Sequence, residues 1–203
     1  MLHHFDIIKN ELLQRMHQEL PQWLGYHNVA HTLDVIDQTE RIAMAEKMRD
    51  TEDLFLLKTA ALFHDSGFIY TYKNHEEQSC EIAIASLAQY GLNDRHLDTV
   101  CSIVMATKIP QLPSNKLEQI MSDADLDYLG RSDFYTHSDN LKAEFFHEGF
   151  VSTEKDYNQL QLAFLESHHY FTASEIALRL PAKNERITEI TAWLQQHRQQ
   201  VTY

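Results

Sequence analysis

The types and settings of four side chains point to a site for a divalent metal ion. His64 and Asp65 directly follow an apolar run over residues 54–63. An imidazole and a carboxylate at the end of a buried helix are costly unless they have a partner, and a divalent cation would satisfy both. His31 lies upstream and Asp125 downstream, so the chain offers a mixed set of nitrogen and oxygen ligands.

This ligand set narrows the chemistry of the ion. Imidazole and carboxylate groups suit Mn²⁺, Fe²⁺, Co²⁺, Ni²⁺, Mg²⁺ or Zn²⁺, and the lack of thiolate ligands argues against a structural zinc site. Four protein ligands on an ion that accepts six would leave positions for water and for a substrate oxygen, as a hydrolytic site requires. We therefore expect one divalent ion as the cofactor.

Elements far apart in the sequence must position these ligands. His31 precedes His64 by 33 residues and Asp125 follows Asp65 by 60, so no local loop builds the site and three helices must meet. Only 5 glycines and 4 prolines occur in 203 residues, and apolar residues recur at helical spacing. Both features predict a single all-α domain.

The expected helices have recognisable starts and ends. Thr51 and Asn115 are suited to cap helix N-termini, Gly91 to end a helix, and Pro181 to bend or break the last one. Residues 68–74 are expected to form a loop or a short extended piece. The helices are expected at about 5–20, 29–48, 51–65, 75–90, 93–107, 115–121 and 172–197, with less regular helical segments between 134 and 165.

Composition excludes some classes of protein. With 43% hydrophobic residues the chain can bury an ordinary core, and a net charge of −13 argues against duplex nucleic-acid binding, though not against a small anionic substrate. Cys80 and Cys101 show no CxxC spacing and are expected to be reduced thiols. The N-terminus lacks the pattern of a signal peptide, and no apolar run approaches the roughly 20 residues of a membrane span. A cytoplasmic protein without membrane contact is expected.

Three motifs together resemble the HD superfamily of metal-dependent phosphohydrolases. They are YHNVAHT at residues 26–32, AALFHDSG at residues 60–67 and IMSDADL at residues 120–126. The resemblance covers about residues 20–135 and implies an HD-like helical core, here with helical additions at both ends. It also implies His31, His64, Asp65 and Asp125 as the ligands, where the preceding small residue selects Asp125 over Asp123.

The resemblance implies further roles around the metal. Asp65 or Asp123 would orient the attacking water or accept its proton. His75 follows the His-Asp doublet by about ten residues, where several HD branches have a histidine that contacts substrate phosphate or a second metal. It would donate to a phosphoryl oxygen or protonate the leaving group. The alternative is that His75 merely begins a helix.

Three basic residues are candidates for substrate binding. Lys108 and Arg131 could neutralise phosphate, and His27 lies four residues before His31 on the same helical face. Lys108 could equally be a solvated residue at a helix end. Ala106 stands where binuclear HD branches often place a histidine, and since alanine cannot coordinate, one metal ion is favoured over two.

Three functions are compatible with these residues. The first is hydrolysis of a phosphate ester or anhydride of a nucleotide or related small molecule. The second is a metal-containing module that senses a nucleotide with little turnover. The third, a di-iron oxygenase, needs more ligands than the motifs supply. Residues from about 135 onward could close the pocket, form the face of a homodimer or complete the core.

Overall fold

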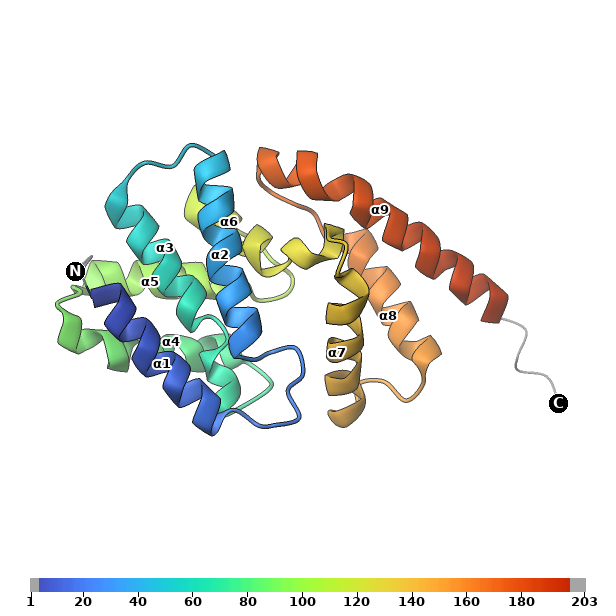
Figure 1. The fold of residues 1–203 in the computed structure, drawn as a ribbon, viewed down its shortest axis with the longest axis horizontal. Coiled ribbons are helices and arrows are strands. Elements are labelled where there is room, and N and C mark those ends of the chain that lie inside the picture. The colour runs from blue at the N-terminus through green and yellow to red at the C-terminus, as the bar shows by residue number, and fades with distance from the viewer. Residues whose placement is uncertain (1–3, 198–203) are drawn as a thin grey trace.

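The computed structural model describes residues 4–197, and these residues form helices joined by short connections, with no β-strand among them (Figure 1). The all-α prediction is therefore confirmed. The helices are α1 (Phe5–Glu19), α2 (Val29–Ala45), α3 (Thr51–Phe63), α4 (His75–Leu87), α5 (Asp94–Met105), α6 (Lys116–Asp125), α7 (Phe134–His147), α8 (Glu154–Ser167) and α9 (Ala173–Gln196). Short 3₁₀ helices are η2 (Ser66–Ile69), η3 (Ala88–Tyr90) and η4 (Asp127–Gly130).

Side-chain caps fix the starts of several helices. Asn115 caps α6 as predicted, by accepting the backbone N–H of Glu118. The cap of α3 is Asp50 rather than Thr51, because the Asp50 carboxylate accepts the N–H groups at 52 and 53. Gly91 adopts a left-handed conformation (φ 76°) at the end of η3, so the predicted stop is confirmed.

Pro181 does not break the last helix. The 24 residues of α9 form one helix with Pro181 inside it. Proline removes the hydrogen bond to the carbonyl four residues earlier, here that of Ala177. Both residues are exposed, so water can replace the lost partner. None of the described helices combines the length and apolar character needed to cross a bilayer.

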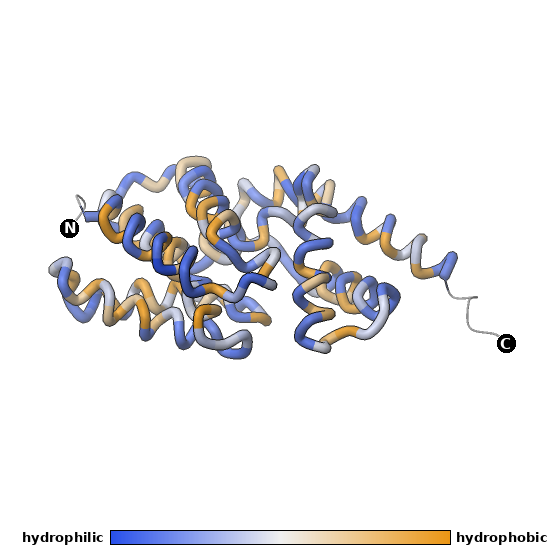
Figure 2. Tube along the Cα trace, turned by 60° about the horizontal axis from the view of Figure 1, so that its bottom comes forward, coloured by the Kyte–Doolittle hydropathy of each residue, from blue (hydrophilic) through white to orange (hydrophobic). Residues whose placement is uncertain are grey.

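The helices gather around two hydrophobic clusters. The larger lies among α1–α6, with α3 buried along most of its length. The smaller joins Tyr26 and η4 to helices α7, α8 and α9. Figure 1 shows α7–α9 beside the first six helices, with η4 between the two groups. Hydrophobic and hydrophilic residues alternate along the helices in Figure 2, as expected where one face of each helix packs against neighbours.

A buried ionic cluster links the two groups of helices. Asp127 in η4 is 1% exposed and accepts hydrogen bonds from Arg41 of α2 at 2.6 Å and Arg179 of α9 at 2.7 Å. A Cβ on Gly130 would lie 2.4 Å from the carbonyl oxygen of Arg179, so only glycine allows η4 and α9 to approach this closely. The arginine cluster comprises Asp34, Arg41, Asp127, Arg131, Asp133, Glu175 and Arg179.

Candidate metal centre

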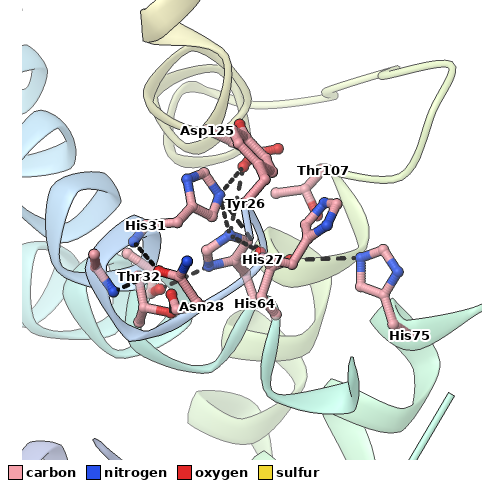
Figure 3. Close-up of polar contacts among 12 residues, drawn as sticks. Tyr26, His27, Asn28, His31, Thr32, His64, His75, Thr107 and Asp125 are labelled. Atoms are coloured by element: carbon pink, nitrogen blue, oxygen red, sulfur yellow. Dashed lines mark hydrogen bonds and ion pairs between the residues drawn. The ribbon is translucent and has the colours of Figure 1, made fainter. Parts of the chain in front are cut away.

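The structure brings His31, His64, Asp65 and Asp125 together from α2, the end of α3 and the end of α6. The Nε2 atoms of the two histidines are 3.4 Å apart. Asp125 Oδ1 lies 3.2 Å from His31 Nε2 and 3.4 Å from His64 Nε2. Asp65 Oδ2 lies 3.4 Å and 3.2 Å from the same two nitrogens. Figure 3 shows His31, His64 and Asp125 pointing toward one another.

The spacing of these atoms fits a shared cation. Nitrogen and oxygen ligands bind Zn²⁺ at about 2.0–2.2 Å, so neighbouring ligand atoms on one ion lie about 3.0–3.5 Å apart. His31, His64 and Asp65 are buried, and their ligand atoms all lie within 4.8 Å of one another. Asp65 Oδ2 is buried with no hydrogen-bond partner among residues 4–197, although two nitrogens are near it. An orphaned carboxylate oxygen is costly, and a cation would remove the cost.

Local hydrogen bonds orient the two histidine ligands in advance. His64 Nδ1 lies 2.8 Å from the carbonyl oxygen of Ala61. A carbonyl oxygen only accepts, so Nδ1 carries a proton and Nε2 is the nitrogen that faces the cluster. Asn28 caps α2 by accepting the backbone N–H groups of Ala30 and His31. This cap fixes the turn that carries His31.

Charges in the cluster are strongly coupled. Burial opposes a positive charge on His64, but Asp65 and Asp125 raise its pKa well above the usual range. Burial likewise opposes the charge on Asp125, yet the two imidazoles lower its pKa to about 2. A cation would compete with the imidazole protons for the same lone pairs. Its binding should therefore release protons and weaken in acid.

His27 forms a second pair, with a glutamate that the sequence analysis missed. His27 Nδ1 lies 2.5 Å from Glu144 Oε2, and Glu144 Oε1 accepts the backbone N–H groups of Tyr26 and His27 at 2.7 and 2.9 Å. Glu144 lies on α7 and is fully buried. Burial opposes the charge on His27, but Glu144 raises its pKa above the ordinary value. The imidazole is thus held as a hydrogen-bond donor.

Phe68 places His75 beside the ligands. Its ring stacks on His27 on one side and on His75 on the other, with centroid distances of 4.1 and 3.9 Å. His75 Nδ1 lies 3.2 Å from the carbonyl oxygen of Tyr72, and its Nε2 lies 3.5 Å from Asp65 Oδ1. A Cβ on Gly67 would lie 1.9 Å from the carbonyl oxygen of His75, so only glycine permits this close packing. The sequence drew attention to His75 but not to Phe68.

Tyr26 contributes a polar group to the site. Its ring lies 4.5 Å from that of His31, and its buried hydroxyl has no partner among residues 4–197. Burial raises the pKa of this hydroxyl well above 10, so it remains a donor. In the sequence, only the position of Tyr26 directly before His27 in the first motif could have indicated this role. Glu144 had none, since it lies 117 residues from His27.

A cavity of about 560 Å³ opens beside the ligands and is bounded by both groups of helices. Asp65, Asp125, His27 and His75 all line it, together with Tyr26. Its remaining lining is Phe68, Tyr72, Glu76, Thr107, Ile109, Leu126, Tyr128, Leu129, Leu141, Phe145, Tyr157, Leu160, Gln161, Ala163, Phe164 and Ser167. The part of the chain after residue 135 therefore helps to close this pocket, one of the roles that the sequence left open.

Asp123 is not brought into the cluster, which corrects the expectation that it handles the attacking water. Residues two apart on a helix point about 200° from each other, so Asp123 faces away when Asp125 faces in. The Asp123 carboxylate accepts the backbone N–H groups of Phe171 and Thr172 at 2.9 and 2.7 Å. It is fully buried and fixes the turn before α9.

Lys108 and Arg131 are also held away from the cavity, contrary to the expectation that they bind phosphate. The Lys108 ammonium pairs with Glu77 and donates to Asn74 at 3.3 Å. Arg131 pairs with Asp34 at 2.6 Å and with Asp133 at 2.5 Å within the arginine cluster. Neither side chain lines the cavity. In this structure both cations are paired with carboxylates of the chain instead.

Comparison with known proteins agrees with this geometry. The family model described as HD domain matches residues 28–127, the segment that contains all four candidate ligands. The structure resembles the crystal structure of a predicted HD superfamily hydrolase from an uncultured Thermotogales bacterium. That likeness has a TM-score of 0.59 at 19% identity and covers 95% of this chain and 90% of the other. No curated protein matches the chain. The chain is thus an HD-domain protein, whose fold extends beyond the matched segment into α7–α9.

Proposed function

We propose that this protein is a metal-dependent phosphohydrolase that cleaves a phosphate ester or anhydride of a small molecule. One observation carries the proposal: a buried set of histidine and carboxylate ligand atoms, with an orphaned Asp65 Oδ2, opens onto a cavity. A structural metal site is closed by its ligands, whereas a catalytic one keeps an open position. The predicted HD superfamily hydrolase that shares the fold supports the same class of reaction.

Different residues around the cavity would have different roles in the reaction. A divalent cation held by His31, His64, Asp65 and Asp125 would polarise a phosphoryl group and lower the pKa of a water toward neutrality. His27, whose pKa Glu144 raises against the effect of burial, would donate to a phosphoryl oxygen and offset the charge that develops there.

His75 is the candidate for proton transfer. Its Nδ1 donates to a carbonyl oxygen, so its Nε2 faces Asp65 and the cavity. In its imidazolium form, with both ring nitrogens protonated, it would donate the Nε2 proton to the leaving oxygen. The Tyr26 hydroxyl, a buried donor without a partner among the described residues, would hold a second phosphoryl oxygen.

Metal content and phosphate release test the proposal together. The full chain is stripped with a chelator and reloaded separately with Mn²⁺, Mg²⁺, Co²⁺ or Ni²⁺. Bound metal is measured by elemental analysis, and phosphate release is followed over a panel of phosphate esters and nucleotides. We expect about one ion per chain and metal-dependent turnover, both lost in His64→Ala. His169→Ala, at an exposed histidine outside the site, is the matched control.

Two results would contradict the proposal. If the chain binds no metal, the assignment of His31, His64, Asp65 and Asp125 as ligands is wrong. A chain that binds metal but releases no phosphate from any ester would favour the alternative of a nucleotide-sensing module. That alternative would then require metal-dependent binding of a nucleotide, measured by calorimetry.

A further inference from the structure

The cavity beside the metal centre has a lining that suits an apolar ligand. The wall away from the ligands is formed by Leu141 and Phe145 of α7 and by Leu160 and Phe164 of α8. Leu160, Ala163, Phe164 and Ser167 follow helical spacing, so one face of α8 is directed to the cavity. Leu160 is 46% exposed, a large apolar side chain that a ligand could cover.

The charge around the cavity limits the anion that it can take. No lysine or arginine among residues 4–197 lines the cavity, and three carboxylates do: Asp65, Glu76 and Asp125. One divalent ion would bring two positive charges to these three carboxylates, so the lining has little positive charge to spare. A phosphomonoester carries at most two negative charges and fits such a site better than a polyanion does. A nucleoside triphosphate carries more charge and is usually held by additional lysine or arginine side chains.

Gln161 and Tyr157 of the distant wall already use their hydrogen-bond donors within the protein. Gln161 Nε2 donates to Ser138 Oγ at 2.5 Å, and Tyr157 donates to the carbonyl oxygen of Ser138 at 2.8 Å. A nucleobase placed against this wall would find no free donor on these two side chains, so an acceptor of the base that is buried there would lack a partner, which is costly. An alkyl or aryl group has no such acceptor.

We propose that the substrate is a phosphomonoester of an apolar alcohol, and this inference rests on the proposed function. The phosphate lies at the metal centre and the alkyl or aryl group lies against α7 and α8. Water attacks phosphorus, the P–O bond to the alcohol breaks, and the leaving oxygen takes one proton. The products are inorganic phosphate and the alcohol. A cavity of about 560 Å³ is large enough for such a group.

The test compares phosphomonoesters that differ only in apolar length. The metal-loaded full chain is assayed with ethyl, butyl, hexyl and octyl phosphate, and with AMP and ATP. Each buried methylene is worth about 0.8 kcal/mol, so kcat/KM should rise by up to about fourfold per methylene until the cavity is full. We expect hexyl phosphate to exceed ethyl phosphate, AMP and ATP by at least about tenfold.

Two variants in α8 and one control in α9 test whether α8 causes the preference for longer alkyl groups. Leu160→Lys introduces a cation into the wall and should lower the ratio of kcat/KM for hexyl over ethyl phosphate by about tenfold. Leu178→Lys makes the same change at a leucine of similar exposure (52%) on α9, outside the cavity, and should leave the ratio unchanged. Ala163→Phe partly fills the cavity from an exposed position and should move the optimum to a shorter chain.

The outcomes separate this inference from the proposed function. Turnover of phosphate esters without dependence on chain length, or with ATP or AMP preferred, overturns the inference and leaves the phosphohydrolase in place. If no ester is hydrolysed, the proposed function falls. Binding of hexylphosphonate and ethylphosphonate to the metal-loaded chain then decides the inference: tighter binding of the longer compound supports the apolar pocket, and equal binding overturns it.

Discussion

Two clusters of buried carboxylates in this protein differ in where their cations come from. Around Asp127, three arginines face four carboxylates, all supplied by the chain. Around Asp65 and Asp125 the chain supplies only histidines, which are cations only when they are protonated. Burial of a carboxylate without a cation is costly. The difference indicates which cluster binds a cation from solution and which one holds the fold together.

The two clusters also differ in their access to solvent space. Asp127 joins α2, η4 and α9 and does not line the cavity. Asp65 and Asp125 lie at the cavity wall. The first arrangement suits a structural link between the two groups of helices. The second suits a metal ion that must meet a substrate, so substitutions in the two clusters should have opposite signatures.

The largest expected effect is the loss of activity in Asp65→Asn. The change keeps the shape of the side chain but removes a ligand charge, so metal affinity and phosphate release should each fall by more than about 100-fold, the upper range for residues that only support a ligand. The apoprotein should also lose some stability at neutral pH. Burial opposes the charge on Asp65, but His64 and the other imidazoles lower its pKa in the folded chain, so the charged carboxylate stabilises the fold. Elemental analysis, phosphate release and melting in chelator check this. Loss of folding with the metal retained would contradict it.

Asp127→Asn should show the reverse signature. Removal of the shared acceptor leaves the arginines with less compensation, and breaking a buried ion pair costs about 3–5 kcal/mol. The arginines keep some solvent contact, so we expect the lower end of this range. Denaturant unfolding measures the loss, and metal stoichiometry should remain that of the wild type. A stable variant without metal would reverse the roles of the two clusters.

Metal should stabilise the wild type but not Asp65→Asn. An ion at 100 times its dissociation constant adds about 2.7 kcal/mol to the free energy of unfolding. For a chain of this size that corresponds to a rise of about 5–10 °C in Tm. Thermal melts with chelator and with added Mn²⁺ provide the measurement. If added Mn²⁺ raised the Tm of the wild type and of Asp65→Asn equally, the ion would bind at a site that does not include Asp65.

The smallest expected effect concerns Glu175 in the arginine cluster. Burial raises its pKa from 4.5 to about 7. The folded chain then holds a proton that the unfolded chain has lost, so the contribution of Glu175 to stability falls as the pH rises from 4.5 to about 7. Glu175→Gln should remove this loss. The Tm of the variant minus the Tm of the wild type, both measured in chelator, should rise by a few degrees between pH 5 and pH 8. If this difference in Tm does not change with pH, the raised pKa of Glu175 is refuted.

The sequence predicted those site residues whose positions depend on their neighbours in the chain. His64 and Asp65 follow a buried helix, and His31 follows an asparagine cap, so each could be recognised from its neighbours. Helical geometry also explains the mistake at Asp123, because two residues that are two positions apart on a helix cannot both face one site. That argument was available from the sequence alone.

The rest depended on contacts between distant elements. Glu144 supports His27 across 117 residues, and no local pattern marks it. The carboxylates that engage Lys108 and Arg131 could not be identified before the helices were packed, so both cations looked free. Pro181 was expected to bend or break the last helix, because the sequence did not show that Pro181 and Ala177 would both be exposed.

The division between the ligand-bearing helices and the cavity wall has a consequence for how such an enzyme could change. All four candidate ligands lie between residues 31 and 125, whereas the apolar wall comes from α7 and α8. For the proposed phosphohydrolase, selection or a designed library could therefore alter which compounds are accepted without a change at the candidate ligands. Glu144 is the one position on α7 that such a library should leave unchanged, because its carboxylate pairs with His27. A library that spares this one glutamate would explore new substrates at little risk to the chemistry.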